Sequence, residues 1–193
     1  MLNKAVFIDR DGTLIEDKGY ICDFDQVEIF PFSFEAVRMM NENDFKVIVV
    51  TNQSSIARGI CTEYQVQQLH DKMEELFKSK RSIINAFYYC PFYEHGVVEK
   101  YKKRDDCRKP LPGMILKAAK DFNVNLNESF MIGDNVKDVI AGHKAGCKTM
   151  LVKTGNWCQT KKDLELSKIK PYFIFDNVLK AAFKIIELSS FNS

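Results

Sequence analysis

Short apolar runs alternate with segments of helical periodicity along most of the chain. Strand-like runs occur at residues 5–8, 45–50, 82–89, 129–134, 148–152 and 172–175. Apolar residues at helical spacing predict helices over residues 31–43, 62–77, 112–122, 136–145 and 178–188. Because short strands that alternate with helices are typical of a doubly wound α/β fold, we predict a mostly parallel sheet covered by helices on both faces.

One long segment near the amino end, residues 13–30, has no sustained helical period. It is too short for an independent cap domain, and we interpret it as a flap over a site, with a plain surface loop as the alternative. The chain has 193 residues and shows no internal repeat or interdomain linker. We therefore expect a single domain over residues 1–193, without a separate cap domain.

The composition and net charge of the chain bear on which kinds of binding partner to expect. With 46% hydrophobic and 28% charged residues and a net charge of +2, the chain gives no reason to expect a nucleic acid or an anionic membrane. No apolar run approaches the roughly 20 residues that span a bilayer, and residues 1–4 lead directly into a strand, so we predict a cytoplasmic protein. Its six cysteines are scattered, which in that compartment argues against a disulfide framework.

Two aspartates one residue apart follow the first apolar run. Side chains alternate along a strand, so Asp9 and Asp11 can point the same way where the chain leaves the sheet. A close pair of carboxylates persists at neutral pH mainly when a cation offsets its charge, which favours a divalent metal. The alternative is a pair of solvated turn residues, because Gly12 follows and Asp and Gly are common in turns.

Polar residues also stand at the ends of other predicted elements. Thr51 ends the second run, and its hydroxyl could hold a phosphate oxygen or cap a helix. Arg108 and Lys109 precede a predicted helix whose amino end repels cations, which suggests that an anion binds there. Asp134 ends the fourth run. Because the carboxyl ends of parallel strands meet at one crevice, we predict a Mg²⁺ and phosphoryl site that combines these residues with the first two aspartates.

Together these stretches resemble the four motifs of the haloacid dehalogenase superfamily of phosphohydrolases, at residues 9–13, 51–54, 109 and 133–138. Residues 51–59 and 107–110 resemble, more narrowly, the subfamily of heptose bisphosphate 7-phosphatases and histidinol-phosphatase domains. The resemblance covers residues 5 to about 155. It implies a Rossmann-like haloacid dehalogenase fold and Mg²⁺-dependent removal of phosphate from a small sugar phosphate. For a heptose substrate it implies a place in nucleotide-activated heptose synthesis for lipopolysaccharide or capsule precursors.

The resemblance also implies roles for individual residues. Asp9 would be the nucleophile that forms an aspartyl-phosphate, and Asp11 would act first as a general acid and then as a general base. Mg²⁺ would be held by Asp9, the main-chain carbonyl of Asp11, and Asp134. Asp138 would orient the outer shell of the metal or Lys109.

Further contacts would reach the phosphate and the sugar. Thr51 and Lys109 would bind the equatorial phosphoryl oxygens. The rest of the substrate would be contacted by Asp17, Lys18, Gly19, Tyr20, Asn52, Gln53, Ser54, Arg108 and Asn135. Position 135 is Asn where the subfamily often carries Lys, so one expected cation is missing there.

The subfamily often has a structural zinc loop of the form Cys-Pro-His followed by Cys-x-Cys. Here Cys90 and Cys107 remain, whereas Phe92 and Asp105 occupy the positions of a His and a Cys. A degenerate zinc site would comprise Cys90, His95, Asp105 and Cys107, but structural zinc prefers four Cys or His ligands. We therefore predict a loop without zinc in which both cysteines are free thiols.

Four functions are consistent with these motifs. The leading one is hydrolysis of a heptose bisphosphate, or a similar sugar phosphate, by a monomer. Hydrolysis of histidinol phosphate uses nearly the same motifs. Hydrolysis of nucleic-acid 3′-phosphate ends is disfavoured by the near-neutral net charge. A phospho-accepting signalling domain would store the aspartyl-phosphate, whereas Asp11 should hasten its hydrolysis, which favours an enzyme.

Overall fold

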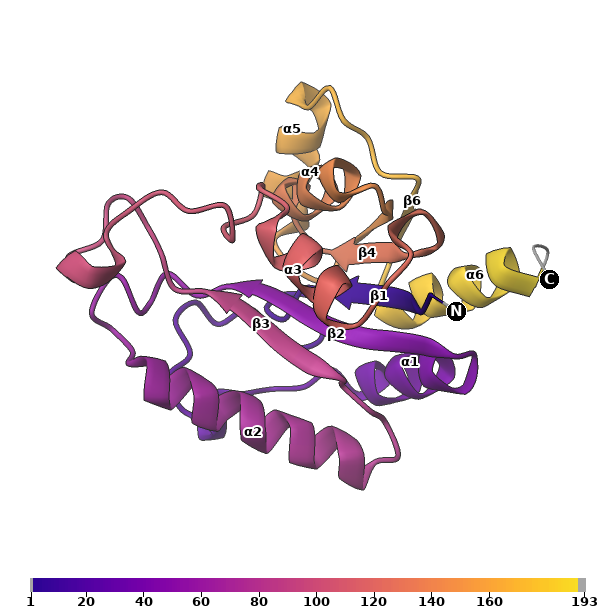
Figure 1. The fold of residues 1–193 in the computed structure, drawn as a ribbon, viewed down its shortest axis with the longest axis horizontal. Helices are drawn as coiled ribbons and strands as arrows, with labels where there is room; N and C mark the ends of the chain where they lie inside the picture. Colours follow the sequence, from indigo (N-terminus) through magenta and orange to yellow (C-terminus); the bar gives the residue numbers. More distant parts are fainter. Residues whose placement is uncertain (1, 191–193) are drawn as a thin grey trace.

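The computed structural model describes residues 2–190 and contains a six-stranded sheet. Its strands are β1 Lys4–Ile8, β2 Phe45–Asn52, β3 Ala86–Cys90, β4 Phe130–Gly133, β5 Lys148–Val152 and β6 Phe173–Phe175. They lie in the order β3-β2-β1-β4-β5-β6, and all neighbours are parallel. Because β1 lies between β2 and β4, the residues that follow these three strands emerge side by side (Figure 1).

Helices cover both faces of the sheet. They are α1 Pro31–Glu42, α2 Glu63–Ser79, α3 Gly113–Asp121, α4 Val136–Ala145, α5 Trp157–Leu166 and α6 Val178–Ser190. In β1, Val6 and Ile8 join the core formed with α1, α2 and α6, whereas Ala5 and Phe7 join the core formed with α3 and α4. Figure 1 shows α1 and α2 below the sheet and α3 and α4 above it. This alternation confirms the predicted doubly wound, parallel fold. Among the described helices, none is both long and apolar enough to span a membrane.

The predicted strand at 82–89 begins later than expected, at Ala86. The preceding residues bond to other parts of the chain. The Ile83 amide donates to Asn41 Oδ1, and Asn85 Oδ1 accepts from the Val47 amide. Side-chain bonds therefore replace part of the strand ladder before Ala86, although the Asn85 amide still donates to the Val47 carbonyl, and an apolar pattern alone does not reveal these bonds.

Helix α5 is not predicted by the sequence pattern. Thr160 is its one buried residue, so no apolar stripe marks the helix. The available signal is its N-cap, because the Asn156 side chain accepts from the Gln159 amide.

The segment interpreted as a flap is only partly exposed. Leu14 and Ile15 are fully buried, and the Phe30 amide donates to the Leu14 carbonyl, so both ends of the segment belong to the body of the fold. Residues 17–20 are exposed, and so are Asp23, Asp25, Gln26 and Glu28. Exposed residues therefore occur along most of the segment between its anchored ends, and its interpretation as a flap stays a prediction.

Candidate active site

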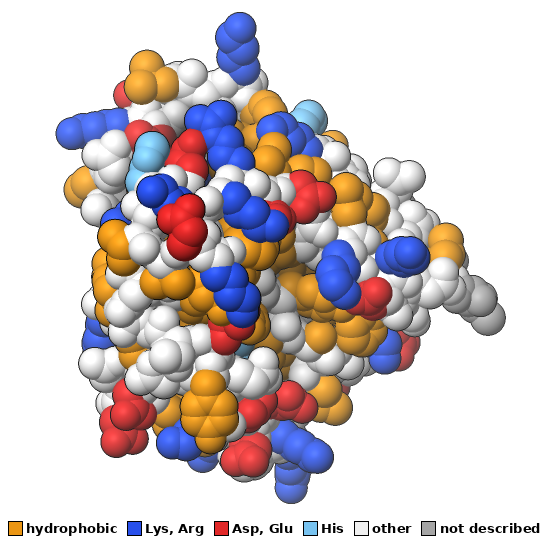
Figure 2. All heavy atoms as spheres, turned by 60° about the vertical axis from the view of Figure 1, so that its left-hand side comes forward, with side chains coloured by type: hydrophobic (Ala, Val, Ile, Leu, Met, Phe, Trp, Pro, Cys, Tyr) orange, Lys and Arg blue, Asp and Glu red, His pale blue; other side chains and the backbone are white. Residues whose placement is uncertain are grey.

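Residues at and after the carboxyl ends of β1, β2 and β4 line a cavity of about 350 Å³. The four residues predicted to be catalytic all line it: Asp9, Asp11, Thr51 and Lys109. Figure 2 brings forward the side to which the strands point and shows acidic and basic side chains next to one another over this face. The cavity is therefore strongly polar, as a site for a phosphate ester and a cation must be.

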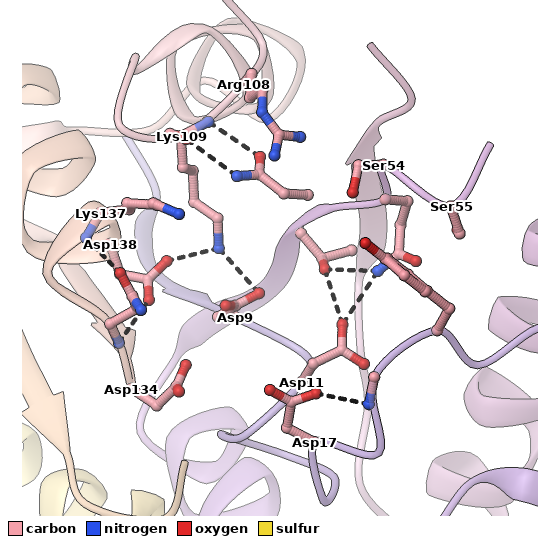
Figure 3. Close-up of a pocket in the computed structure, with 16 residues that line it drawn as sticks. Asp9, Asp11, Asp17, Ser54, Ser55, Arg108, Lys109, Asp134, Lys137 and Asp138 are labelled. Carbon is pink, nitrogen blue, oxygen red and sulfur yellow. Dashed lines mark hydrogen bonds and ion pairs between the residues drawn. The ribbon is translucent and has the colours of Figure 1, made fainter. Parts of the chain in front are cut away.

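Lys109 lies at the centre of the acidic cluster. Its Nζ is 2.9 Å from Asp9 Oδ1 and 2.6 Å from Asp138 Oδ1, and its side chain is almost fully buried (Figure 3). Burial opposes the charged ammonium, but Asp138 and Asp9 outweigh that effect and raise the pKa of Lys109. The Asn52 side chain fixes the Lys109 backbone by accepting from its amide at 3.0 Å and donating to its carbonyl at 3.0 Å. A charged ammonium is thereby held at a defined place in the cavity.

Three carboxylates are arranged to hold a metal ion. Ligand atoms of Asp9, Asp134 and Asp138 lie within 4.8 Å of one another, and within residues 2–190 this is the one such group. Burial, reinforced by neighbouring carboxylates, raises the pKa of Asp9 to about 7 and that of Asp134 to about 8. The Lys109 ammonium offsets only one of the three carboxylate charges. Mg²⁺ would offset the rest, and carboxylate oxygens are the ligands that it prefers. Asp138 thus contacts Lys109 and also borders the metal position, in keeping with its expected supporting role.

Backbone without side chains makes room for Asp134. A Cβ on Gly155 would lie 1.9 Å from Asp134 Oδ2, and a Cβ on Gly12 would lie 2.7 Å from the same oxygen. Gly12 also has a φ of +72°, a conformation that other residues rarely adopt. The Thr154 hydroxyl donates to the Gly12 carbonyl at 2.6 Å and ties the loop after β5 to the loop after β1. Asp134 is therefore confined between two backbone segments.

The Asp11 carboxylate is held by donors on several sides. It accepts from the Thr51 hydroxyl at 3.3 Å and from the Gln53 side-chain amide at 3.1 Å (Figure 3). Arg10, which is buried, donates to both of its oxygens, with the closest contact at 2.9 Å. Gln53 also donates to the Thr51 hydroxyl at 2.9 Å. Asp11 is a wall residue of the cavity whose orientation is set by neighbours.

The residues predicted to contact the substrate fall into two groups. Those with side chains or backbone open to the cavity are Asp17, Gly19, Tyr20, Ser54 and Arg108. Asn52 and Gln53 also line it, but their amides bond to Lys109 and Asp11, so they act as supports.

Lys18 and Asn135, which were also predicted to contact the substrate, each bond to another residue. Lys18 pairs with Glu28 at 2.7 Å and does not line the cavity, so the structure does not place it in the site. Asn135 lines the cavity, and its side chain also caps α4 by accepting from the Lys137 amide. Lys137 itself lines the cavity and supplies a cation two residues after the position where one was missing (Figure 3).

The prediction of free thiols at Cys90 and Cys107 is wrong, because a disulfide joins them. The other two members of the degenerate zinc set lie elsewhere. His95 is exposed next to Glu94, and Asp105 pairs with Lys103 at 2.9 Å. These four residues do not form a ligand cluster in the described part of the chain.

A second disulfide joins Cys22 to Cys61 and also contradicts the expectation of unpaired cysteines. Its two residues are 39 positions apart, so their spacing carries no signal of pairing. The bond connects the segment after β1 to the loop after β2, two stretches that border the cavity. Cys147 and Cys158 are free.

Sequence reasoning missed Arg10, His70, Ser55 and Lys137. Ser55 and Lys137 line the cavity. Arg10 was visible as a cation between two aspartates, but a charged residue in a turn is normally assigned to solvent. His70 shares the apolar face of α2 with Leu69 and Met73, which is the available signal that it is buried.

Comparisons with known proteins agree with this geometry. The family model described as HAD-hydrolase-like matches residues 106–181. The D-glycero-β-D-manno-heptose-1,7-bisphosphate 7-phosphatase of Pasteurella multocida is 44% identical over 155 residues, which cover 80% of this chain and 84% of that protein. The chain belongs to the heptose bisphosphate phosphatase family of haloacid dehalogenase-like hydrolases. The family member from Escherichia coli strain K12 is 39% identical over 152 residues, which cover 78% of this chain and 80% of that protein.

Solved structures are similar to this chain as well. The D,D-heptose 1,7-bisphosphate phosphatase from B. bronchiseptica, complexed with magnesium and phosphate, matches with a TM-score of 0.82 and 29% identity over 96% of this chain and 99% of that one. The corresponding phosphatase from Burkholderia thailandensis has a TM-score of 0.68 at 24% identity and shows the shared fold. These comparisons confirm three predictions for this chain: the haloacid dehalogenase superfamily, phosphatase chemistry and the use of Mg²⁺.

Proposed function

We propose that this protein removes the 7-phosphate from D-glycero-β-D-manno-heptose 1,7-bisphosphate with the help of Mg²⁺. The observation that carries the proposal is the placement of Asp9, Lys109 and Asp134 around one cavity. The heptose substrate and its β configuration come from the names of relatives such as those of Pasteurella multocida and Escherichia coli. Action as a monomer in the cytoplasm, without a nucleic acid or membrane partner, stays a prediction from the sequence.

Asp9 and Asp11 carry the chemistry in two steps. First, an Asp9 carboxylate oxygen bonds to phosphorus while the bond from phosphorus to the C7 oxygen breaks, and Asp11 gives its proton to that oxygen. Then Asp11 takes a proton from water, the water oxygen bonds to phosphorus, and the bond from phosphorus to Asp9 breaks to release inorganic phosphate. Mg²⁺, held by Asp9 and Asp134, would offset the negative charges of nucleophile and phosphate.

The phosphoryl group gathers negative charge on its outer oxygens as it is transferred. Lys109 supplies a fixed positive charge next to Asp9. Thr51 lines the same cavity, and its hydroxyl, which donates to Asp11 in this structure, would turn to a bound phosphoryl oxygen. Donors that are already in place stabilise the transition state without reorganising during the reaction. Loss of one such donor typically costs about 10²- to 10³-fold in rate.

Two arginines support binding of a second phosphate. The guanidinium carbon of Arg108 is 5.0 Å from the Tyr93 ring centre, and that of Arg58 is 4.4 Å from the same ring. Two cations on one aromatic ring repel each other, so a dianion beside them would be favoured. Arg108 lines the cavity and is the arginine within reach of a bound substrate.

The test is release of inorganic phosphate from a panel of esters at saturating Mg²⁺. The panel holds the β and α anomers of the heptose bisphosphate, fructose 1,6-bisphosphate and histidinol phosphate, with Asp9→Asn as the blank. We expect a kcat/KM preference of about 10²-fold, or about 2.7 kcal/mol, for the β anomer. A preference for histidinol phosphate would show that the proposed substrate is wrong. If no ester released phosphate, the proposed reaction itself would be overturned.

A further inference from the structure

A buried arginine and a buried histidine lie behind Asp11. Arg10 is the largest of the fully buried side chains in the described chain, and His70 on α2 is 1% exposed. The guanidinium donates from Nη2 to Asp11 Oδ1 at 2.9 Å and from Nε to Asp11 Oδ2 at 3.2 Å. Its remaining nitrogen, Nη1, lies 3.0 Å from His70 Nε2. Arg10 therefore joins the Asp11 carboxylate to helix α2.

The chemistry of the two groups determines the form of His70. A guanidinium can only donate hydrogen bonds, so His70 Nε2 accepts and the ring carries its proton on Nδ1. Burial, and then the charge of Arg10, lower the pKa of His70 well below its ordinary value, so the ring is neutral. A neutral imidazole is the one state of this side chain that can accept a bond from arginine.

His70 is not the side chain that packing alone would select. Its ring stacks on Phe87 with centres 4.6 Å apart, a contact that a phenyl ring would also make. Its Nδ1 is buried without a hydrogen-bond partner among the described residues, which is unfavourable. The compensating contact is the one that Nε2 makes with Arg10.

We propose that Arg10 and His70 are positioning residues that hold Asp11 in the orientation needed to protonate the leaving oxygen. Neither residue lines the cavity, so both act through Asp11. The two-pronged contact from arginine fixes both carboxylate oxygens, and the histidine stops the guanidinium from turning. Orientation matters because a displacement of about 1 Å at a reacting group can cost about 10²-fold in rate.

The inference rests on the proposed function, and its test uses the acidity of the leaving group. A sugar hydroxyl is a poor leaving group and needs a proton, whereas 2,4-dinitrophenolate leaves without one. A poorly placed Asp11 should therefore lower kcat/KM for the heptose bisphosphate far more than for 2,4-dinitrophenyl phosphate. A general loss of structure would lower both values together.

Three variants at the pair and one control separate these outcomes. We expect His70→Phe and Arg10→Lys to lower kcat/KM for the heptose bisphosphate by about 10-fold or more, with less than about threefold change for the aryl ester. His70→Gln retains an acceptor for Arg10 and should stay within about threefold of the wild type on both substrates. Phe87→Leu removes the stacked ring without touching the polar link, and its ratio of the two kcat/KM values should not change.

Two results would overturn the inference: equal losses on both substrates, or no loss in either of the first two variants. Thermal melting of each variant identifies those that fail to fold. If His70→Phe does not fold, Arg10→Lys compared with His70→Gln still decides the question. Failure of the proposed function is distinct, because the wild type itself would then not hydrolyse the heptose bisphosphate.

Discussion

Asp134 keeps its position because two neighbouring residues have no side chain. Gly155 follows β5, and its backbone packs directly on one carboxylate oxygen of Asp134. The φ angle of Gly155 is not in the left-handed region, unlike that of Gly12, so alanine at 155 meets a spatial conflict and not a strained backbone. The position of a proposed metal ligand can thus be disturbed by a substitution at a neighbouring glycine.

We expect Gly155→Ala to weaken Mg²⁺ binding by about 10-fold or more, because the new methyl group must displace the Asp134 carboxylate. The measurement is the rise in Tm on titration with Mg²⁺, together with the Mg²⁺ concentration that gives half-maximal activity. Thr154→Ser retains the hydroxyl that bonds to Gly12 and serves as the neighbouring control. An unchanged Mg²⁺ titration in Gly155→Ala would show that Asp134 is not a ligand at this position.

Arg108 is placed to contact the part of the substrate beyond the transferred phosphate. If it binds the phosphate that is not transferred, Arg108→Gln should raise KM for the heptose bisphosphate by about 10-fold and leave kcat within about threefold. Heptose 7-phosphate lacks that second phosphate, so its kcat/KM should hardly change. Lys18→Gln is the control, because Lys18 lies outside the cavity. Equal effects on both substrates would argue against a contact to the second phosphate.

At the scale of elements, the Cys22–Cys61 disulfide restrains the segment that carries the exposed turn at residues 17–20. It links that segment to the loop after β2, which contributes Ser54 and Ser55 to the cavity. A cross-link between such distant residues stabilises a protein chiefly by restricting its unfolded chain, typically by about 2–4 kcal/mol. The bond therefore affects both stability and the shape of the cavity rim.

We expect Cys61→Ser to lower the free energy of unfolding by about 2–4 kcal/mol under non-reducing conditions. Cys158→Ser changes an exposed, free cysteine and should have an effect below about 0.5 kcal/mol. Urea unfolding with and without reductant is the measurement, and reductant should narrow the gap between the wild type and Cys61→Ser. Peptide mapping without reduction that finds Cys22 as a free thiol would contradict the pairing.

The strands and helices could be predicted from the sequence wherever the hydrophobic pattern was strong. The buried strands at 45–52 and 148–152 are nearly continuous apolar runs, and the order of strands and helices then leaves few topologies. Helix α5 and the start of β3 could not be predicted, because the first has no apolar stripe and the second depends on bonds from Asn41 and Asn85.

The site was predictable as a set of motif residues but not as a network. Asp9, Asp134 and Lys109 meet because they follow parallel strands or precede a helix at one edge of the sheet. Asn52 and Gln53 were expected to face the substrate, yet their side-chain amides bond to Lys109 and Asp11. Which partner a side-chain amide selects depends on distances of a few tenths of an ångström, and spacing along the chain does not contain that information.

At the scale of the whole molecule, the acidic cluster links stability to pH. Burial raises the pKa of Asp9 to about 7 and that of Asp134 to about 8, from 3.8. Between about pH 4 and pH 8 the folded, metal-free protein therefore binds more protons at these two groups than the unfolded chain does. These two groups therefore contribute to the free energy of unfolding at low pH, and that contribution is lost as the pH rises through their folded-state pKa values.

We expect the Tm in EDTA to fall between pH 5 and pH 8, and the increase in Tm caused by Mg²⁺ to grow over the same interval. Mg²⁺ competes with protons for the carboxylates, so its affinity should rise as they ionise. At 100 times its Kd the ion should add about 2.7 kcal/mol to the free energy of unfolding. Asp134→Asn removes one titrating ligand and should flatten both trends, which separates the cluster from other ionisable groups. An Mg²⁺ increment that is constant from pH 5 to pH 8 would mean that the carboxylates are already ionised in the metal-free protein.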